Sequence, residues 1–233
     1  MSEFKFKQFT ISQEGAPFKV GTDSMILGSW VKLKGEESVL DIGTGTGILA
    51  LMVAQRISTG KVLATEPNRA AFELAKSNFE NSPFNEKLIA VNEPLQKLEP
   101  NASFDMIISN PPYFSDSTLS KKSTISSRHT VDLKFIEIAE YCQNYLAKNG
   151  RVFIVLPVKE FSEFKYQMEN KTFFEVRRLE ISSFENSKVK RICAEFSRSE
   201  AMLETEKLTI RNSADNSYSE SYQELVNEYQ IRF

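Results

Sequence analysis

The sequence predicts an α/β fold with a mostly parallel sheet and helices on both of its faces. Strand-like and helix-like segments alternate from residue 38 to residue 169, which is the pattern of strands joined by helical crossovers. The strands of this region are short and largely apolar, as buried parallel strands are. After residue 170 the strand-like segments follow one another without helices, so we expect an antiparallel edge at the C-terminal end of the sheet.

The central region supplies the parallel part of the predicted sheet. Each of its strands ends in a polar or glycine-rich turn, and each helix carries apolar residues at helical spacing. The expected elements are, in order, the strand Ser38–Asp41, a glycine-rich turn at 43–47, the helix Ile48–Arg56, the strand Lys61–Thr65, the helix Asn68–Phe79, and the strands Lys87–Val91 and Phe104–Ser109.

The second half begins with a long amphipathic helix, Asp132–Lys148, which Asn149-Gly150 is expected to cap. The strand Arg151–Leu156 and a helix over 159–169 follow. Three more strands are expected, and the last twenty residues read as a turn, a short helix and a terminal strand. The expected strands are Phe173–Ile181, Val189–Ser197 and Glu204–Ile210.

The amino-acid composition of the chain argues against several classes of function. The chain has 233 residues, a net charge of −2 and 41% apolar residues, so it can bury a core but is not basic enough to bind nucleic acid over its whole surface. No apolar run approaches the ~20 residues of a membrane span, and the N-terminus lacks a secretory signal, so a cytoplasmic protein is expected. Its one histidine and its two cysteines, Cys142 and Cys193, do not predict a metal site; the cysteines read as reduced core thiols.

We expect one domain over residues 1–233. Its parts are an N-terminal arm and cofactor-covering segment (1–30), a cofactor-binding and catalytic core (36–170), and a sheet edge with a C-terminal strand (171–233). The Ser/Thr/Lys-rich segment 114–131 is long for a connection, which is typical of a functional or disordered loop.

Three glycines stand between the first strand of the core and its helix. In VLDIGTGTGILA, Gly43, Gly45 and Gly47 allow a tight turn and close approach of a ligand, and the helix start offers N–H groups to an anionic group. A dinucleotide fingerprint would require glycine where Ile48 stands, which excludes a nicotinamide dehydrogenase.

Acidic residues frame this turn. Asp41 would repel a pyrophosphate but attracts an amino group, and Glu66 ends the next strand, where a ribose-binding carboxylate stands in nucleotide-binding α/β folds. S-adenosyl-L-methionine carries an ammonium, a carboxylate, a sulfonium and a ribose diol. Asp41, the glycine turn and Glu66 suit all of these groups except the sulfonium, so the pattern indicates this cofactor.

The strand at 104–109 ends in the unusual sequence DMIISNPPYF. The Asn110 side-chain carbonyl and the Pro111 backbone carbonyl can accept hydrogen bonds from an exocyclic amine, which frees its delocalised lone pair without a strong base. Pro112 biases Pro111 towards an extended conformation, and Tyr113 offers a ring on which a base can stack, with Phe114 extending it. The pattern is typical of amine methylation driven by positioning and polarisation.

These motifs carry a family resemblance. The D-x-G-x-G-x-G turn, Glu66 and N-P-P-Y together resemble class I S-adenosylmethionine-dependent amino-methyltransferases. The bacterial tRNA1(Val) (adenine-37-N6)-methyltransferase family has an N-terminal segment that resembles FKQFTISQEGAPFKVGTDSMILGSW in this chain. Later stretches of that family are similar to SRHT at 127–130 and VKRICAEFSR at 189–198. The similarity covers nearly the whole chain, and K-V-G-T-D and the C-terminal stretches are its more specific part.

The resemblance implies a Rossmann-like class I fold with a seven-stranded sheet. It further implies methylation of the N6 amine of adenine, at position 37 in the anticodon loop of tRNA1(Val), by a monomeric cytoplasmic enzyme that needs no metal. The cofactor-binding residues it implies are Lys19, Gly21, Thr22, Asp23, Asp41, Gly43, Thr44, Gly45, Gly47, Glu66, Pro67 and Glu93. The catalytic residues are Asn110, Pro111, Pro112 and Tyr113, and the substrate-binding residues are Phe114, Lys121, Lys122, Arg128 and His129.

One position departs from the class I pattern. Pro94 stands where many of these enzymes carry a polar residue near the cofactor adenine, so Asn92, Glu93 or the backbone is expected to make that contact.

Other substrates remain alternatives, and so does one function without catalysis. N-P-P-Y also serves methylation of a protein glutamine, although the chain reaches its glycine turn by residue 43 and leaves no room for a helical N-terminal domain. Adenine in rRNA or DNA is a further alternative, and the absence of a large recognition domain counts against DNA. An inactive module that binds the cofactor is the alternative from a different class, and the intact Asn110-to-Tyr113 corner counts against it.

Overall fold

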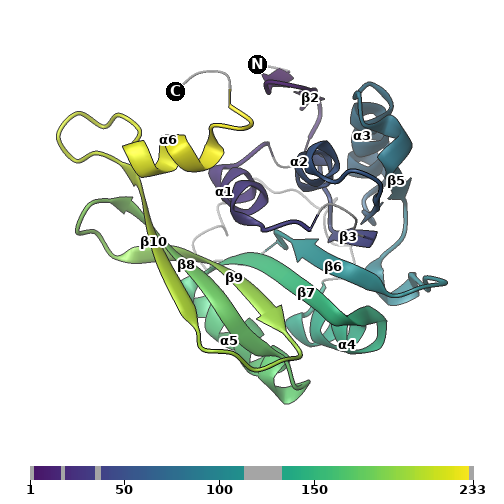
Figure 1. The fold of residues 1–233 in the computed structure, drawn as a ribbon. Coiled ribbons are helices and arrows are strands. Elements are labelled where there is room, and N and C mark those ends of the chain that lie inside the picture. Colours follow the sequence, from purple (N-terminus) through teal and green to yellow (C-terminus); the bar gives the residue numbers. More distant parts are fainter. Residues whose placement is uncertain (1–2, 17–18, 35–37, 113–132, 231–233) are drawn as a thin grey trace, which may run out of the picture.

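The computed structural model describes residues 3–16, 19–34, 38–112 and 133–230. At the centre of this part of the chain lies one eight-stranded sheet with the strand order β10-β8-β9-β7-β6-β3-β4-β5 (Figure 1). Its strands are β3 (Ser38–Ile42), β4 (Lys61–Thr65), β5 (Leu88–Val91), β6 (Phe104–Ser109), β7 (Leu146–Pro157), β8 (Phe174–Phe184), β9 (Val189–Ser197) and β10 (Glu204–Arg211).

The predicted α/β class is confirmed, with one more strand than the seven expected. From β5 to β7 every pairing is parallel, so the strands that alternate with helices in the sequence lie side by side in one direction. The count of seven was wrong because all three of the strands that follow residue 170 join the same sheet as the core strands.

The C-terminal edge is antiparallel only in part. Strand β9 runs antiparallel to both of its neighbours, β7 and β8, as predicted. The outermost strand β10 instead pairs with β8 in parallel, which corrects the expected antiparallel edge. The reason lies in the connection: β9 ends at Ser197, opposite the start of β8 at Phe174, and the segment 198–203 passes this end of β8. As a result β10 enters the sheet alongside β8 and in the same direction.

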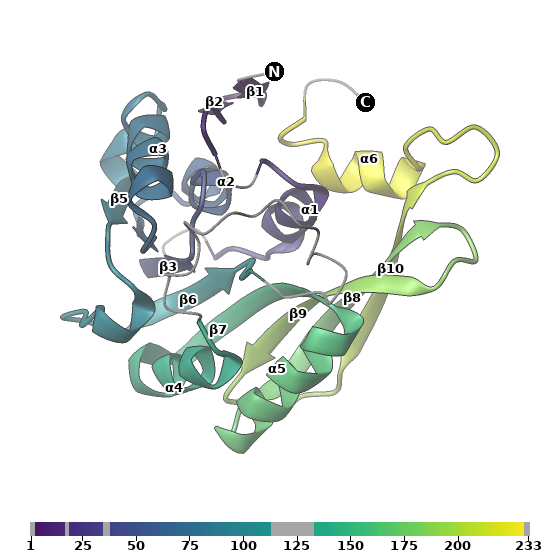
Figure 2. The same ribbon diagram turned by 180° about the vertical axis from the view of Figure 1, so that it is seen from behind.

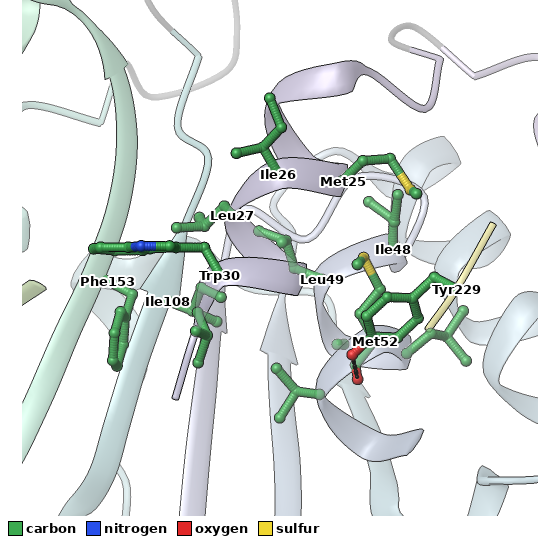
Figure 3. Close-up of a cluster of buried hydrophobic side chains, with 14 of the residues drawn as sticks. Met25, Ile26, Leu27, Trp30, Ile48, Leu49, Met52, Ile108, Phe153 and Tyr229 are labelled. Carbon is green, nitrogen blue, oxygen red and sulfur yellow. Dashed lines mark hydrogen bonds between the residues drawn. The ribbon is translucent and has the colours of Figure 1, made fainter. Parts of the chain in front are cut away.

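Helices cover both faces of the sheet, as expected (Figures 1 and 2). Within the described residues, one face packs against four helices and the other against two, and each face buries its own apolar cluster. The first group is α1 (Thr22–Trp30), α2 (Ile48–Arg56), α3 (Arg69–Glu80) and α6 (Glu220–Val226); the second is α4 (Phe135–Tyr145) and α5 (Val158–Asn170). Figure 3 shows the apolar side chains of α1 and α2 meeting those of the sheet.

Helix α4 is shorter than the predicted 132–148. It ends at Tyr145, and the chain is already extended at Leu146, whose buried side chain opens β7 opposite Phe104. Asn149-Gly150 is therefore not a helix cap. Gly150 is needed for close packing instead, since a Cβ there would lie 2.7 Å from Cγ of Leu146.

The two ends of the described chain meet. Strands β1 (Glu3–Lys5) and β2 (Thr10–Ser12) form a hairpin within the expected N-terminal arm, and Phe6 bridges Gln230. Tyr229 is fully buried and donates a hydrogen bond from its hydroxyl to the Met52 carbonyl at 2.8 Å (Figure 3). In the expected terminal strand, the structure describes one isolated bridge, at Gln230. Residues 231–233 lie outside the described residues.

Cys142 and Cys193 are both free and buried, as predicted. Burial raises the pKa of the Cys142 thiol to about 12. Among the described residues, no group of three or more His, Cys, Asp or Glu side chains is arranged to hold a metal ion. No helix in these ranges combines the length and apolar character that crossing a bilayer requires.

Candidate active site

The candidate site lies where the order of the sheet reverses. From β3 the chain adds β4 and then β5 on one side, whereas β6 and β7 lie on the other. In open α/β sheets ligands bind at the carboxyl ends of the strands at such a switch point. Gly43 follows β3 and Asn110 follows β6, so the two predicted motifs leave the sheet at this point.

The two motifs are held at adjacent strand ends. Ile42 and Ser109 are paired neighbours in the parallel ladder, and the buried Ser109 hydroxyl donates to the Ile42 carbonyl at 2.8 Å. Neighbouring strands lie about 4.8 Å apart, so the first residue of the glycine turn and Asn110 emerge side by side. Asn110 is only partly buried, Pro111 is buried and Pro112 is exposed.

The three glycines of the turn have different surroundings. All three have positive φ values, of 70° at Gly43, 57° at Gly45 and 86° at Gly47. A Cβ at Gly43 or Gly45 would meet nothing within 4 Å, whereas a Cβ at Gly47 would lie 2.4 Å from Cε1 of Phe79 in α3. The first two glycines therefore leave space at the surface of the turn, and the third lets α3 pack against it.

The N–H groups of the turn are mostly used within the protein. Those of Gly43 and Thr44 donate to the Thr65 carbonyl, and that of Gly47 donates to the Thr44 carbonyl. The Gly45 N–H donates to Oε2 of Glu66 at 3.0 Å. These four N–H groups are therefore paired within the protein, and what the turn offers a ligand is close approach. The N–H donors predicted at the start of α2 are a separate set, of which the Ala50 N–H donates to Asp41.

Asp41 is fully buried beneath the turn. Its Oδ2 accepts from the Thr44 hydroxyl at 2.6 Å and from the Ala50 N–H in α2 at 3.2 Å, so it ties the turn to the helix that follows. Within the described residues, its Oδ1 has no hydrogen-bond partner. Desolvation raises the pKa of this carboxyl to about 7, although the two hydrogen bonds oppose the shift.

Replacing Asp41 with asparagine is expected to change how stability depends on pH. The folded state holds the Asp41 proton up to about pH 7, against 3.8 for the free group, so ionisation favours the unfolded chain. The wild-type protein should lose stability relative to Asp41→Asn as pH rises from 4 to 7, by about 1.4 kcal/mol per unit of pKa shift. Urea unfolding at pH 5, 6 and 7 measures this difference, and parallel pH profiles would contradict it.

Glu66 is buried at the end of β4 beside the turn. Besides the bond from Gly45, its Oε1 accepts from the Asn68 N–H at 2.9 Å. Desolvation raises the pKa of this carboxyl, and the two backbone hydrogen bonds oppose the shift. Each carboxylate oxygen can accept a further hydrogen bond, which is what a ribose diol needs.

The adjoining loops are fixed by Asn92. Its amide donates to the carbonyls of Glu66 at 2.8 Å and Pro67 at 3.3 Å, so this side chain holds two loops together. The Thr65 hydroxyl donates to the Glu93 carbonyl, which fixes the backbone there while the Glu93 side chain stays exposed. Of the residues named for the adenine contact, Glu93 is thus the one with an exposed carboxylate beside the site.

The K-V-G-T-D stretch leads into α1. Lys19, Gly21 and Thr22 are exposed, and the Gly21 carbonyl accepts the first bond of the helix, from Met25. Asp23 forms an ion pair with Arg191 of β9, with 3.0 Å between Oδ2 and Nε. K-V-G-T-D and VKRICAEFSR, the stretches that carried the more specific resemblance, therefore meet in space.

Two residues of this region had not been singled out from the sequence. Ser24 in α1 accepts a hydrogen bond from Nδ2 of Asn110 at 2.9 Å. Asn78 in α3 donates to the carbonyls of Ser12 and Thr46, and its Oδ1 accepts the Ser12 N–H, so it joins the N-terminal hairpin to the glycine turn. The signal for Asn78 was a polar residue on the apolar face of its helix, at helical spacing from Ala71 and Ala75.

The remaining predicted site residues lie outside the described residues. These are Tyr113, Phe114, Lys121, Lys122, Arg128 and His129. Their assignments stay predictions from the sequence.

Comparison with known proteins agrees with this geometry. The family model of the methyltransferase small domain matches residues 18–182. A tRNA1(Val) (adenine(37)-N6)-methyltransferase of Tolumonas auensis is 35% identical over 231 residues, covering 98% of this chain and 97% of the relative. A protein of the same name from a Flavobacteriaceae bacterium is 34% identical, with 95% of each chain covered.

Solved structures share the fold at lower identity. A protein described as a predicted O-methyltransferase from Agrobacterium tumefaciens superposes with a TM-score of 0.71 at 17% identity, covering 89% of this chain and 96% of the other. M. jannaschii TYW2 in complex with AdoMet gives 0.56 at 15% identity, covering 85% and 87%. From the match to residues 18–182 and the relatives aligned over their full length, the chain belongs to the tRNA1(Val) (adenine(37)-N6)-methyltransferase family of the methyltransferase small domain proteins.

Proposed function

We propose that this enzyme transfers the methyl group of S-adenosyl-L-methionine to the N6 amine of adenine 37 in the anticodon loop of tRNA1(Val). The observation that carries the proposal is the position of the Asn110 carboxamide, which leaves β6 next to the glycine turn at the switch point of the sheet. The names of the full-length relatives support the choice of adenine 37 and of tRNA1(Val).

The residues around the turn fit S-adenosyl-L-methionine. Gly43 and Gly45 leave open space at the surface, as a ligand in close contact requires. The unpartnered Oδ1 of Asp41 is a buried carboxyl oxygen, and an ammonium group, directly or through a water bound to it, would favour the ionised form of this carboxyl. Glu66 would accept the ribose hydroxyls, and Lys19, Gly21, Thr22, Asp23, Thr44, Gly47, Pro67 and Glu93 would complete the cofactor site. When bound, the cofactor supplies an electrophilic methyl group on its sulfonium.

Asn110 would act on the amine that receives the methyl group. Its Oδ1 and the backbone carbonyl of Pro111 would each accept one N–H of the adenine amine, which draws the nitrogen towards a pyramidal shape and frees its lone pair. Pro112 restrains the preceding backbone, which holds the Pro111 carbonyl in place. The amine needs no strong base before attack, because it loses its proton after the new C–N bond has formed.

The target base has to leave its stack in the anticodon loop to reach this corner. Tyr113 and Phe114 would stack against it, at about 1–3 kcal/mol per base. Lys121, Lys122, Arg128 and His129 would contact the phosphates of the loop. We propose a monomeric enzyme that works in the cytoplasm, where its tRNA substrate is found.

Incubation with labelled S-adenosyl-L-methionine and two transcripts tests the proposed function. One transcript is tRNA1(Val), and the other is the same tRNA with guanine at position 37, which lacks the N6 amine. Nucleoside analysis should find N6-methyladenosine in the first transcript and no label in the second. Equal labelling of both, or label that appears only in protein or DNA, would contradict the proposal in favour of another amine substrate.

A further inference from the structure

The orientation of the Asn110 carboxamide decides whether it helps or hinders the reaction. A carboxamide has an acceptor end, the oxygen, and a donor end, the NH2 group. The adenine amine needs an acceptor, so a carboxamide rotated by 180° would present two hydrogens to it. Something in the protein has to distinguish the two ends.

In the structure, the side chain that meets the NH2 end of Asn110 is Ser24. Its hydroxyl oxygen lies 2.9 Å from Nδ2 of Asn110 and accepts a hydrogen bond from it. Ser24 is buried, with 7% of its surface exposed, whereas Asn110 is partly exposed to the site. With the NH2 group turned to Ser24, the oxygen is the end left for the substrate.

The helix that carries Ser24 is fixed on several sides. Gly28 packs against α2 so closely that a Cβ there would lie 2.6 Å from Sδ of Met52. Arg56 donates to the carbonyls of Gly28 and Val31 at the end of α1. Next to Ser24, Asp23 is paired with Arg191 on β9. A hydroxyl on an anchored helix is a better reference for orienting a side chain than one on a loop.

We propose that Ser24 is a positioning residue, which holds the Asn110 carboxamide with its oxygen towards the target amine. The proposal rests on the proposed function, because it concerns the same methyl transfer. Ser24 does not touch the reacting atoms; it acts through Asn110, as residues behind a catalytic group commonly do.

Kinetics of Ser24→Ala test this proposal. Loss of one hydrogen bond should lower kcat by about 3- to 10-fold, with KM for S-adenosyl-L-methionine unchanged, and Ser24→Thr, which keeps a hydroxyl, should recover most of the loss. Ser29→Ala is the matched control. It removes a hydroxyl from the same helix, and the buried Oγ of Ser29 has no hydrogen-bond partner within the described ranges.

Two further measurements separate positioning from a structural effect. In an Asn110→Ala background, Ser24→Ala should have no additional effect on kcat, because its partner is gone. In NMR spectra, the Asn110 side-chain amide signal, identified by its loss in Asn110→Ala, should shift in Ser24→Ala and not in Ser29→Ala. The signal can be read whether or not the enzyme methylates tRNA1(Val), so it tests the contact apart from the proposed function.

An active wild-type enzyme whose Ser24→Ala variant matches Ser29→Ala in kcat would overturn the proposal. An unshifted Asn110 amide signal in Ser24→Ala would also overturn it. A wild-type enzyme that methylates neither transcript would contradict the proposed function instead, even where the amide signal shifts as expected.

Discussion

Replacing Asn110 with alanine is expected to lower kcat for adenine methylation by about 10²–10³-fold, the cost of losing one group that stabilises a transition state. The variant loses the acceptor that we propose to polarise the amine, while the glycine turn, Asp41 and Glu66 stay in place. Binding of S-adenosyl-L-methionine should therefore remain that of the wild-type enzyme. Single-turnover kinetics with tRNA1(Val) measure the first quantity and calorimetry measures the second.

Asn81→Ala is the matched control for this experiment. Asn81 is an exposed asparagine at the end of α3, and its amide donates to the Ser77 carbonyl in the same helix. It should leave both kcat and cofactor binding unchanged. Unchanged turnover in Asn110→Ala, or loss of cofactor affinity equal to the loss of kcat, would remove Asn110 from the chemistry.

Gly47→Ala and Gly45→Ala look alike in the sequence, but Gly47→Ala is expected to lower the free energy of unfolding more. A non-glycine residue at φ 86° costs about 1–2 kcal/mol. The added Cβ would also lie 2.4 Å from Cε1 of Phe79, so the buried Phe79 ring would have to shift, at a further cost of about 1–3 kcal/mol. Together the free energy of unfolding should fall by about 2–5 kcal/mol.

Gly45→Ala is the comparison for this prediction. Its φ of 57° is also positive, but a Cβ there would meet nothing within 4 Å, so the strain of about 1–2 kcal/mol stands alone. The methyl group would project into the space that we assign to the cofactor, and affinity for S-adenosyl-L-methionine should fall more than in Gly47→Ala. Urea unfolding and calorimetry on both variants measure these effects; the reverse order of stabilities would contradict the assignment of Gly47 to helix packing.

The parallel core could be predicted because its signals are local. The strands and the glycine turn each appear as a continuous pattern, and most of their boundaries hold within two residues. The edge of the sheet was harder, because the direction of β10 depends on how the segment 198–203 passes the start of β8, and no local pattern records it. The end of α4 was missed for a similar reason, since Leu146 is drawn into the ladder by Phe104, a distant residue.

In the candidate site, too, local features could be predicted from the sequence and long-range contacts could not. Asp41, Glu66 and Asn110 stand at or beside the ends of three neighbouring strands, and a parallel sheet brings such ends to one edge, so the sequence was sufficient to predict this common edge. The long-range contacts around the site could not be predicted. The contact between Ser24 and Asn110 joins residues 86 positions apart, and the pair of Asp23 with Arg191 joins residues 168 apart. Such contacts depend on how α1 crosses the finished sheet.

A crystal structure of the enzyme with S-adenosylhomocysteine is the most direct test of whether Asn110 and the methyl donor lie together. A reacting nitrogen about 3–3.5 Å from the methyl group, and about 2.9 Å from Oδ1 of Asn110, places the sulfur within about 8 Å of Oδ1. We expect that separation, with the sulfur facing the turn at Gly43 and Gly45. A sulfur much farther from Asn110 than this, or a side chain packed between the two, would contradict the central claim that the carboxamide and the methyl donor meet in one cavity.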